Sequence, residues 1–404
     1  MRNYSRITPE GTRDLLFKEC RIQREAERKL AQLFSNRGYS EVLTPGLEYY
    51  DVFCLPDSGI PQQEMYKTTD NNGRLIVFRP DSTLPIARMA AARLQHAVLP
   101  IRLFYNQCVY RNRPDLSGKE NEIYQMGVEM LGATGLRADI EVISMAVEAL
   151  AKFTDDFRIE IGHAALFKAF ANRLPISSEK KEVIRATIEA KNYGALEEQL
   201  SSLDQVEAVE AIRSLPRLFG GEEALEKAKV FCTDEETEGI LTYLRTLYEA
   251  ITRLGYGDRV IVDLGLVQRN DYYSGVVFSA YAETAGEAVL VGGRYDMLLE
   301  KFDMPMPAVG FSIDTEAAVQ MILSDVKYTG TKKERVIVHT ETGFENLGQE
   351  TVRAEIEAGK ICELSVFDTL ENSMAYAKQI GAKKIIHISE KICEIDALCG
   401  EEEI

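Results

Sequence analysis

Two polar residues four positions apart, Gln125 and Glu129, lie in a segment whose pattern predicts a β-strand around Ile123–Glu129. Alternation along a strand places residues four apart on the same face of a sheet. If that face is buried, the amide and the carboxylate both need hydrogen-bond partners. A ligand with a cation or an N–H donor provides such partners, so we interpret the pair as part of a binding site.

Four further residues could serve either a ligand or the fold. Asp81 follows an Arg-Pro dipeptide, where it either caps a helix or contacts a ligand. Tyr272 and Tyr273 are adjacent, and strand alternation predicts that only one ring faces each side of a sheet. Arg111 suits either a phosphate contact or a structural ion pair. The residues alone leave these alternatives open.

Metal and disulfide chemistry have little support in the sequence. Seven cysteines are an odd number, and none of them forms a CxxC pair, so neither a zinc site nor a disulfide framework is indicated. The four histidines (His96, His163, His339 and His387) are scattered, and we interpret them as structural. We therefore expect no metal and no cofactor.

Length and charge narrow the class of protein. A chain of 404 residues with 45% hydrophobic and 27% charged residues is typical of a folded protein of two to three domains. The net charge of −17 argues against nucleic acid as the main partner. No apolar run approaches the ~20 residues that span a membrane. The polar N-terminus lacks a signal core, which predicts a cytoplasmic location.

The segments before residue 164 predict a mixture of helices and strands. We expect helices over 19–37, over 86–94 with Ser82 or Thr83 as its cap, and over 139–153, and strands at YSEVLTP (39–45), 75–78, 102–110 and 123–129.

The rest of the chain predicts three further regions. A helical segment spans about 164–255 and interrupts the strand-rich part, which resumes with strands at 260–262, 275–281 and 288–291. Gly292-Gly293 indicates a turn, followed by a helix from Tyr295. The core thus covers 1–325, a polar linker covers 326–334, and 335–404 alternate as βαβαβ, which predicts a small α/β domain with a parallel sheet.

Seven blocks in order resemble class II histidyl-tRNA synthetase. They are PEGTRDLL (9–16), GYSEVLTPGLE (38–48), EMYKTTDNNGRLIVFRPDST (64–83), QMGVEMLG (125–132), DYYSGVVF (271–278), GGRYDMLL (292–299) and PAVGFSIDTE (307–316). The resemblance implies an α+β fold, namely an antiparallel sheet flanked by helices, with a helical insertion and a small C-terminal domain that resembles a shortened anticodon-binding domain. It also implies that the GYSEVLTP block forms a dimer interface.

The resemblance also assigns an amino-acid pocket. The family's histidine-contacting positions correspond to Asp81, Thr83, Gln125, Glu129, Tyr272 and Tyr273. Carboxylates and an amide oxygen accept hydrogen bonds from an ammonium and an imidazole N–H, and tyrosines pack on a ring. These residue types suit histidine.

The residues for ATP chemistry depart from the family's pattern. Arg111 keeps an ATP-motif arginine, but Arg113 stands where an acidic residue is usual. Ala317 follows Glu316 where the third motif has an arginine. Gln268 stands where the histidyl enzymes have a further arginine, although Arg269 is adjacent and could substitute for it. Arginine is not replaceable by alanine or glutamine at a bidentate phosphate site, so we predict no catalytic residues.

A retained histidine pocket beside lost ATP arginines resembles the non-catalytic branch of this family, the regulatory subunits of ATP phosphoribosyltransferase. That resemblance implies a hetero-complex with a short-form catalytic subunit, in which this chain forms a dimer and histidine is the effector. Two alternatives remain open: a histidyl-tRNA synthetase with divergent ATP motifs, and another histidine-binding paralogue. The acidic C-terminal segment, with about twice as many acidic as basic residues, disfavours RNA binding.

Overall fold

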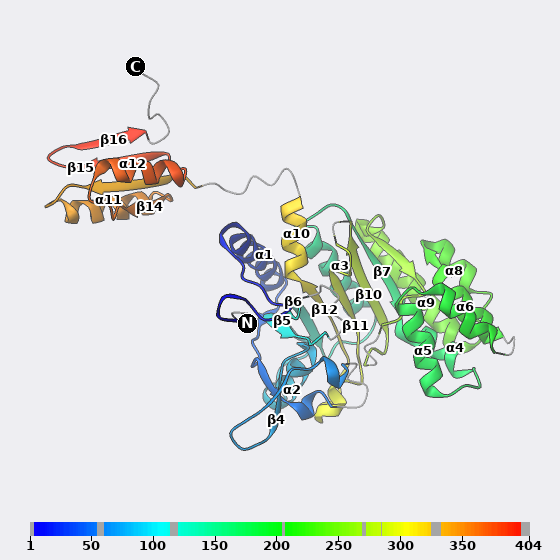
Figure 1. The fold of residues 1–404 in the computed structure, drawn as a ribbon. Helices are drawn as coiled ribbons and strands as arrows, with labels where there is room; N and C mark the ends of the chain where they lie inside the picture. Colours follow the sequence, from blue (N-terminus) through cyan, green and yellow to red (C-terminus); the bar gives the residue numbers. More distant parts are fainter. Residues whose placement is uncertain are drawn as a thin grey trace. The chain divides into compact units, whose positions relative to one another are not determined.

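The chain folds into two compact units, Met1–Asp325 and Val326–Ile404. The computed structural model in Figure 1 describes residues 4–54, 60–113, 120–203, 207–268, 272–283, 285–324 and 333–396. The first unit contains a nine-stranded sheet and a three-stranded sheet, and the second contains a four-stranded sheet. No helix within these ranges is long and apolar enough to cross a lipid bilayer.

The large sheet is mainly antiparallel, and only the β1–β5 and β7–β9 pairs are parallel. Its strands, in spatial order, are β1 (Ser40–Glu41), β5 (Ile101–Tyr110), β6 (Glu122–Leu131), β12 (Ala308–Asp314), β11 (Leu290–Arg294), β10 (Val276–Ala282), β7 (Phe157–His163), β9 (Val260–Asp263) and β8 (Phe219–Gly220). The predicted α+β class with an antiparallel central sheet is confirmed. The YSEVLTP strand is shorter than predicted, because only Ser40 and Glu41 pair with β5.

Strand alternation gives the large sheet an apolar face for helices and an opposite face for a cavity. Phe104 of β5 packs against Phe34 of α1 (Phe17–Asn36), with ring centroids 5.8 Å apart. The next residue, Tyr105, points to the other side and lines the cavity. α1 lies beside α10 (Thr315–Ser324) in Figure 1, and Gln23 Nε2 donates to Thr315 Oγ1 at 2.6 Å. α3 (Leu136–Leu150) also packs on the strands of this sheet.

A three-stranded sheet, β2 (Leu47–Tyr49), β4 (Leu75–Phe78) and β3 (Lys67–Thr69), precedes α2 (Thr83–Arg93). The prediction that Ser82 or Thr83 caps α2 is wrong. Asp81 Oδ1 accepts from the Leu84 N–H at 2.9 Å, and Ser82 makes no capping bond. Ser82 already has helical dihedral angles, φ −96° and ψ −30°, so the capping position moves back by one residue.

Within the described residues, the insertion between β7 and β9 contains six α-helices and the short strand β8. The helices are α4 (Ala164–Asn172), α5 (Ser178–Glu189), α6 (Tyr193–Ser201), α7 (Glu207–Ser214), α8 (Glu222–Ala228) and α9 (Glu235–Ile251). His163 caps α4, because its Nδ1 accepts from the Ala165 N–H at 3.3 Å. Burial lowers the pKa of His163 to about 4, so it is neutral at pH 7 and has a structural role.

Gly292 and Gly293 are in β11 and not in a turn, so that prediction is wrong. A Cβ at Gly293 would lie 2.7 Å from the Tyr273 ring, so glycine is needed there for space. The helix predicted from Tyr295 is also absent, and only a 3₁₀ turn forms at Leu299–Phe302. The Tyr295 N–H donates to the Ala308 carbonyl at 2.8 Å, which extends the sheet pairing past Arg294.

The second unit has the strand order β14 (Ile361–Leu364), β13 (Arg335–Thr340), β15 (Lys384–Ile388) and β16 (Ile392–Asp396), with α11 (Glu345–Glu357) and α12 (Leu370–Gln379). The three predicted strands are parallel, whereas β16 pairs antiparallel with β15 and was not predicted. Alternation sends Val336 and Val338 toward α11 and Ile337 toward α12. Most of the predicted linker, residues 326–332, lies outside the described residues.

Candidate functional site

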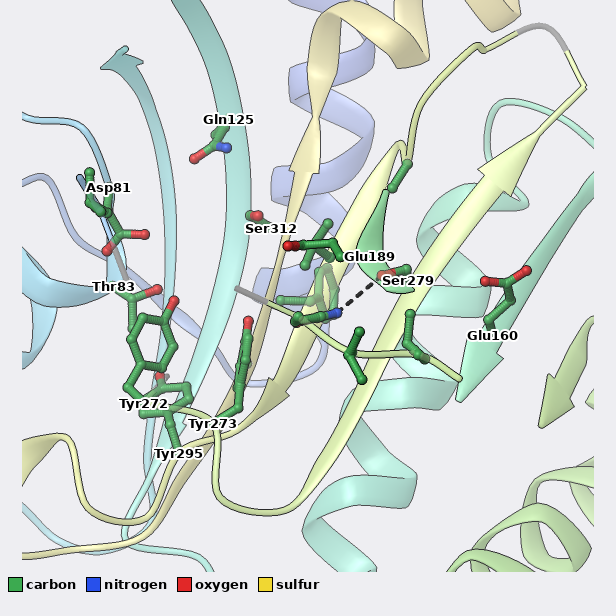
Figure 2. A pocket seen from close by; sticks show the side chains of 18 of the residues that line it. Asp81, Thr83, Gln125, Glu160, Glu189, Tyr272, Tyr273, Ser279, Tyr295 and Ser312 are labelled. Atoms are coloured by element: carbon green, nitrogen blue, oxygen red, sulfur yellow. Dashed lines mark hydrogen bonds between the residues drawn. The ribbon is translucent and has the colours of Figure 1, made fainter. Parts of the chain in front are cut away.

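The site residues predicted from the sequence converge on one cavity of about 420 Å³ in the first unit (Figure 2). Its lining includes Asp81, Thr83, Arg111, Gln125, Glu129, Tyr272 and Tyr273. They come from the start of α2, the end of β5, strand β6 and the loop before β10. These segments are far apart in sequence, and the sheet pairing brings them together.

Glu129 is at the buried end of this cavity, with 2% of its surface exposed. Its Oε1 accepts a 2.8 Å hydrogen bond from Thr83, and its Oε2 accepts one from the Tyr295 hydroxyl. Burial raises the pKa of Glu129 to about 8, although these two hydrogen bonds lower it. Gly310 pairs with Glu129 across β6 and β12, and a Cβ at position 310 would overlap the carboxylate. The sheet therefore holds a carboxyl group that can exchange a proton near neutral pH.

Three tyrosines, Tyr272, Tyr273 and Tyr295, line one side of the cavity (Figure 2). The ring centroids of Tyr272 and Tyr273 are 4.8 Å apart, and Tyr295 lies 5.8 Å from Tyr272. The expectation that these neighbours face opposite sides of a sheet is wrong, because they are in the loop before β10 and both line the cavity. Tyr295 was not predicted as a site residue, and the only sequence signal for it is its place in the GGRYD block.

Asp81 combines the two roles that the sequence left open, since it caps α2 and also lines the cavity. Burial raises its pKa, and the nearby charge of Arg111 counteracts this shift. Arg111 Nε donates to the Pro80 carbonyl at 3.0 Å, which ties the ATP-motif arginine to the segment just before Asp81. An ammonium group bound at Asp81 would stabilise the ionised carboxylate.

Three further carboxylates, Glu160, Glu189 and Asp263, also line the cavity. Burial raises the pKa of Glu160 and of Asp263, and repulsion from Asp263 raises the pKa of Glu160 further. Among the described residues, Glu160 Oε2 and Gln268 Oε1 are buried without a hydrogen-bond partner. Gln268 Nε2 donates to Ser279 Oγ at 3.1 Å, the dashed line in Figure 2. Arg269, the possible substitute for an arginine at 268, lies outside the described residues.

The residues of the third motif make structural contacts. Glu316 forms an ion pair with Arg13, and the Ala317 N–H donates to Asp314 Oδ1 at 3.2 Å. Arg294 of the GGRYD block is likewise structural: its Nη2 is 2.6 Å from the buried Asp139 carboxylate. Neither contact presents an arginine to the cavity.

The charge of the cavity shows which ligands it suits. Its lining contains six carboxylates (Glu64, Asp81, Glu129, Glu160, Glu189 and Asp263) and two cationic side chains (Arg111 and Lys191). A triphosphate needs cations or metal ions around it. Among the described residues the cavity therefore suits a cationic ligand with hydrogen-bond donors, and it is poorly suited to bind ATP.

This sheet, its helical insertion and its tyrosine-lined acidic pocket define a class II synthetase-like protein of the histidyl type. A family model described as Histidyl-tRNA synthetase matches residues 11–318. A histidyl-tRNA synthetase from Nostoc shares the fold, with a TM-score of 0.77 at 19% identity over 97% of each chain.

Other relatives place the chain within that class. ATP phosphoribosyltransferase regulatory subunits of Clostridium kluyveri and Bacillus mycoides are each 37% identical to it, over 93% and 94% of this chain and 97% and 91% of their own lengths. A crystal structure from Bacillus halodurans, described as an ATP phosphoribosyltransferase regulatory subunit/histidyl-tRNA synthetase, has a TM-score of 0.84 at 28% identity and covers 96% of this chain and 99% of its own. The chain belongs to the family of ATP phosphoribosyltransferase regulatory subunits, which confirms the branch that its motifs resemble.

Proposed function

We propose that this chain is the non-catalytic regulatory subunit of a cytoplasmic ATP phosphoribosyltransferase, that it binds a short-form catalytic subunit, and that it confers feedback inhibition by histidine. The relatives that it matches over nearly their whole length are named as regulatory subunits of this enzyme. The observation that carries the histidine part is the composition of the cavity, in which Asp81, Glu129 and the tyrosines remain while cationic groups are few.

Histidine fits this site by charge and shape. Its ammonium group would pair with Asp81, and an imidazole N–H would donate to Glu129. The rings of Tyr272 and Tyr273 provide an aromatic surface for the imidazole. Gln125 lies on the same face of β6 as Glu129 and can donate or accept. Feedback then requires histidine to bind one state of the complex more tightly than another.

Self-association is a second part of the proposal, and exposed apolar residues on the three-stranded sheet support it. Leu47 and Tyr49 on β2 are 46% and 48% exposed, and Phe78 on β4, which pairs with Leu47, is 41% exposed. Leu43, in the GYSEVLTP block, is 75% exposed. Contiguous exposed apolar residues mark interaction surfaces, so we propose that a second copy of the chain covers this face.

The working-synthetase alternative has less support. It requires ATP to bind among six carboxylates, without the arginine that Ala317 replaces. The other alternative, a free-standing histidine sensor, shares the pocket but needs no catalytic partner. Only assembly with that partner separates the sensor from the regulatory subunit.

Co-expression with a short-form catalytic subunit tests the proposal. We expect the two chains to co-purify, and we expect phosphoribosyltransferase turnover to need both of them and to fall when histidine is added. Asp81→Asn and Glu129→Gln should leave assembly and uninhibited turnover intact and shift the inhibition curve to higher histidine concentrations. Glu300→Gln, at an exposed position outside the cavity lining, is the matched control. Parental histidine sensitivity in both pocket variants would place the effector site elsewhere.

A further inference from the structure

A second group of side chains that could bind a ligand lies in the C-terminal unit and includes no residue of the pocket lining. His339, Glu341 and His387 each present one potential metal-ligating atom, and these three atoms lie within 4.8 Å of one another. The two histidines are 48 positions apart in the sequence, and the sequence alone suggests only structural roles for them. The parallel pairing of β13 with β15 places them directly opposite each other, with ring centroids 5.6 Å apart.

Strand alternation explains why the three side chains share one face of the small sheet. Ile337 and Ile385 pack against α12, and the residues two positions further along, His339 and His387, continue that face to the carboxyl ends of β13 and β15. Glu341 is two positions beyond His339, and its N–H donates to the Ile388 carbonyl at 2.8 Å. That hydrogen bond holds the glutamate beside β15 after β13 has ended.

The hydrogen bonds around His339 orient it as a metal ligand. Its Nδ1 is 2.8 Å from Ser373 Oγ, and Ser373 Oγ is 3.2 Å from the Thr369 carbonyl. Ser373 Oγ also lies 2.5 Å from Ser365 Oγ. When the Ser373 hydroxyl donates to the Thr369 carbonyl or to Ser365, its oxygen accepts from the Nδ1–H of His339. This tautomer leaves a lone pair on Nε2. Metal-binding histidines usually donate their other N–H to a protein acceptor in this way.

His387 and Glu341 complete the set on the solvent side. His387 Nε2 is 2.9 Å from Glu341 Oε1. His339 is buried, His387 is partly exposed and Glu341 is exposed, so an ion can enter from solvent. Two imidazole nitrogens and one carboxylate, with a fourth position open to water, form a zinc ligand set.

We propose that His339 Nε2, His387 Nε2 and Glu341 bind a zinc ion at the carboxyl ends of β13 and β15. The ion takes the place of the proton between His387 and Glu341, and small rotations of the exposed Glu341 side chain close the set. Zinc bound there links the segment after β13 to β15 and stabilises the C-terminal unit. This site is separate from the histidine pocket, so it does not depend on the proposed regulatory function.

The test uses the full-length chain, stripped with a chelator, dialysed and titrated with Zn²⁺ against a chromophoric competitor. We expect one high-affinity zinc ion per chain, a higher melting temperature with zinc, and a d–d spectrum of tetrahedral type when Co²⁺ replaces Zn²⁺. His387→Gln and Glu341→Gln each remove one ligand near the surface, and both should weaken zinc binding at least tenfold.

Matched variants separate this site from other metal binding. His96→Gln and Glu357→Gln change an exposed histidine and an exposed glutamate outside the cluster and should keep parental zinc affinity. Cys393→Ser tests thiol binding, because Cys393 pairs with His387 across β15 and β16 but is not one of the three clustered residues. No high-affinity zinc in the parental chain, or unchanged zinc affinity in both His387→Gln and Glu341→Gln, would overturn the proposal.

Discussion

Thr83, in the first turn of α2, donates its hydroxyl hydrogen to Oε1 of Glu129 on β6 at 2.8 Å. This bond joins the helix that Asp81 caps to the central strand of the pocket. One hydrogen bond thus links the two segments that carry Asp81 and Glu129, the two carboxylates proposed to contact histidine. A change at Asp81 or Glu129 affects both ligand recognition and the attachment of α2 to the sheet. The tests below therefore use substitutions that preserve the shape of the side chain.

Asp81→Asn should weaken histidine binding without loss of the helix cap. Asparagine keeps an oxygen for the Leu84 N–H but removes the charge that pairs with an ammonium group. A hydrogen bond to a charged group contributes about 1.5–3 kcal/mol, so we expect about 10- to 100-fold weaker binding. Isothermal titration calorimetry with histidine measures this, with Glu300→Gln as the control. Equal affinities in the two variants would argue that Asp81 is only a cap.

Glu129 should make stability fall as the pH rises. Its pKa of about 8 in the folded chain exceeds the value of about 4.3 for an unfolded glutamate. Between these values the folded state binds more protons than the unfolded state, so the free energy of unfolding decreases with rising pH. Urea unfolding of the parent and of Glu129→Gln at about pH 5, 6, 7 and 8 measures the effect. The difference between the two proteins should change with pH in that direction, and a constant difference would contradict it.

The isolated chain should not form histidyl-adenylate. Among the described residues the cavity contains six carboxylates and two cations, and Ala317 replaces the arginine of the third motif. Histidine-dependent ATP–pyrophosphate exchange should stay at background. Ala317→Arg alone should not restore it, because residues that act as a unit contribute non-additively. Exchange at rates typical of enzymes in the parental chain would instead support a working synthetase.

The exposed face of β2 and β4 should be needed for self-association. Leu47→Asp places a charge among apolar residues that a second copy would bury, and Phe78→Asp does the same on the paired strand. Light scattering at micromolar concentration should give a dimer for the parent and a monomer for these variants. Val98→Asp, at a residue that is 90% exposed and outside this sheet, is the control. A parental monomer would rule out this interface.

Arg294 and Asp139 should be important for stability. The pair is buried, with side-chain exposures of 8% and 0%, and removal of Asp139 leaves the buried Arg294 with only the more exposed Asp296 as its carboxylate partner. Asp139→Ala should cost about 3–5 kcal/mol in the free energy of unfolding. Glu141→Ala, on the same helix, breaks a more exposed pair with Arg102 and should cost about 0–1 kcal/mol. Urea denaturation of both variants provides the comparison.

Much of the fold could be predicted because local patterns were strong. Long strands such as β5 and β6 and amphipathic helices such as α1 follow from the periodicity of their apolar residues. One error arose where a distant residue overrides local preference, and another arose from local backbone geometry. Gly292-Gly293 indicates a turn by itself, but in the folded chain Gly293 gives space to the Tyr273 ring. The α2 cap moved to Asp81 because of the backbone angles at Ser82.

The sequence by itself determined the family, the residue types available for histidine and the loss of an ATP-motif arginine at Ala317. These are properties of residue identity and order. Only the tertiary structure decided that both adjacent tyrosines line the cavity, that Tyr295 bonds Glu129, and that His339 lies opposite His387. The physical reason is that strand pairing sets which distant side chains meet, and burial then sets their charge state. The pKa of Glu129 is raised chiefly because the fold removes its carboxylate from water.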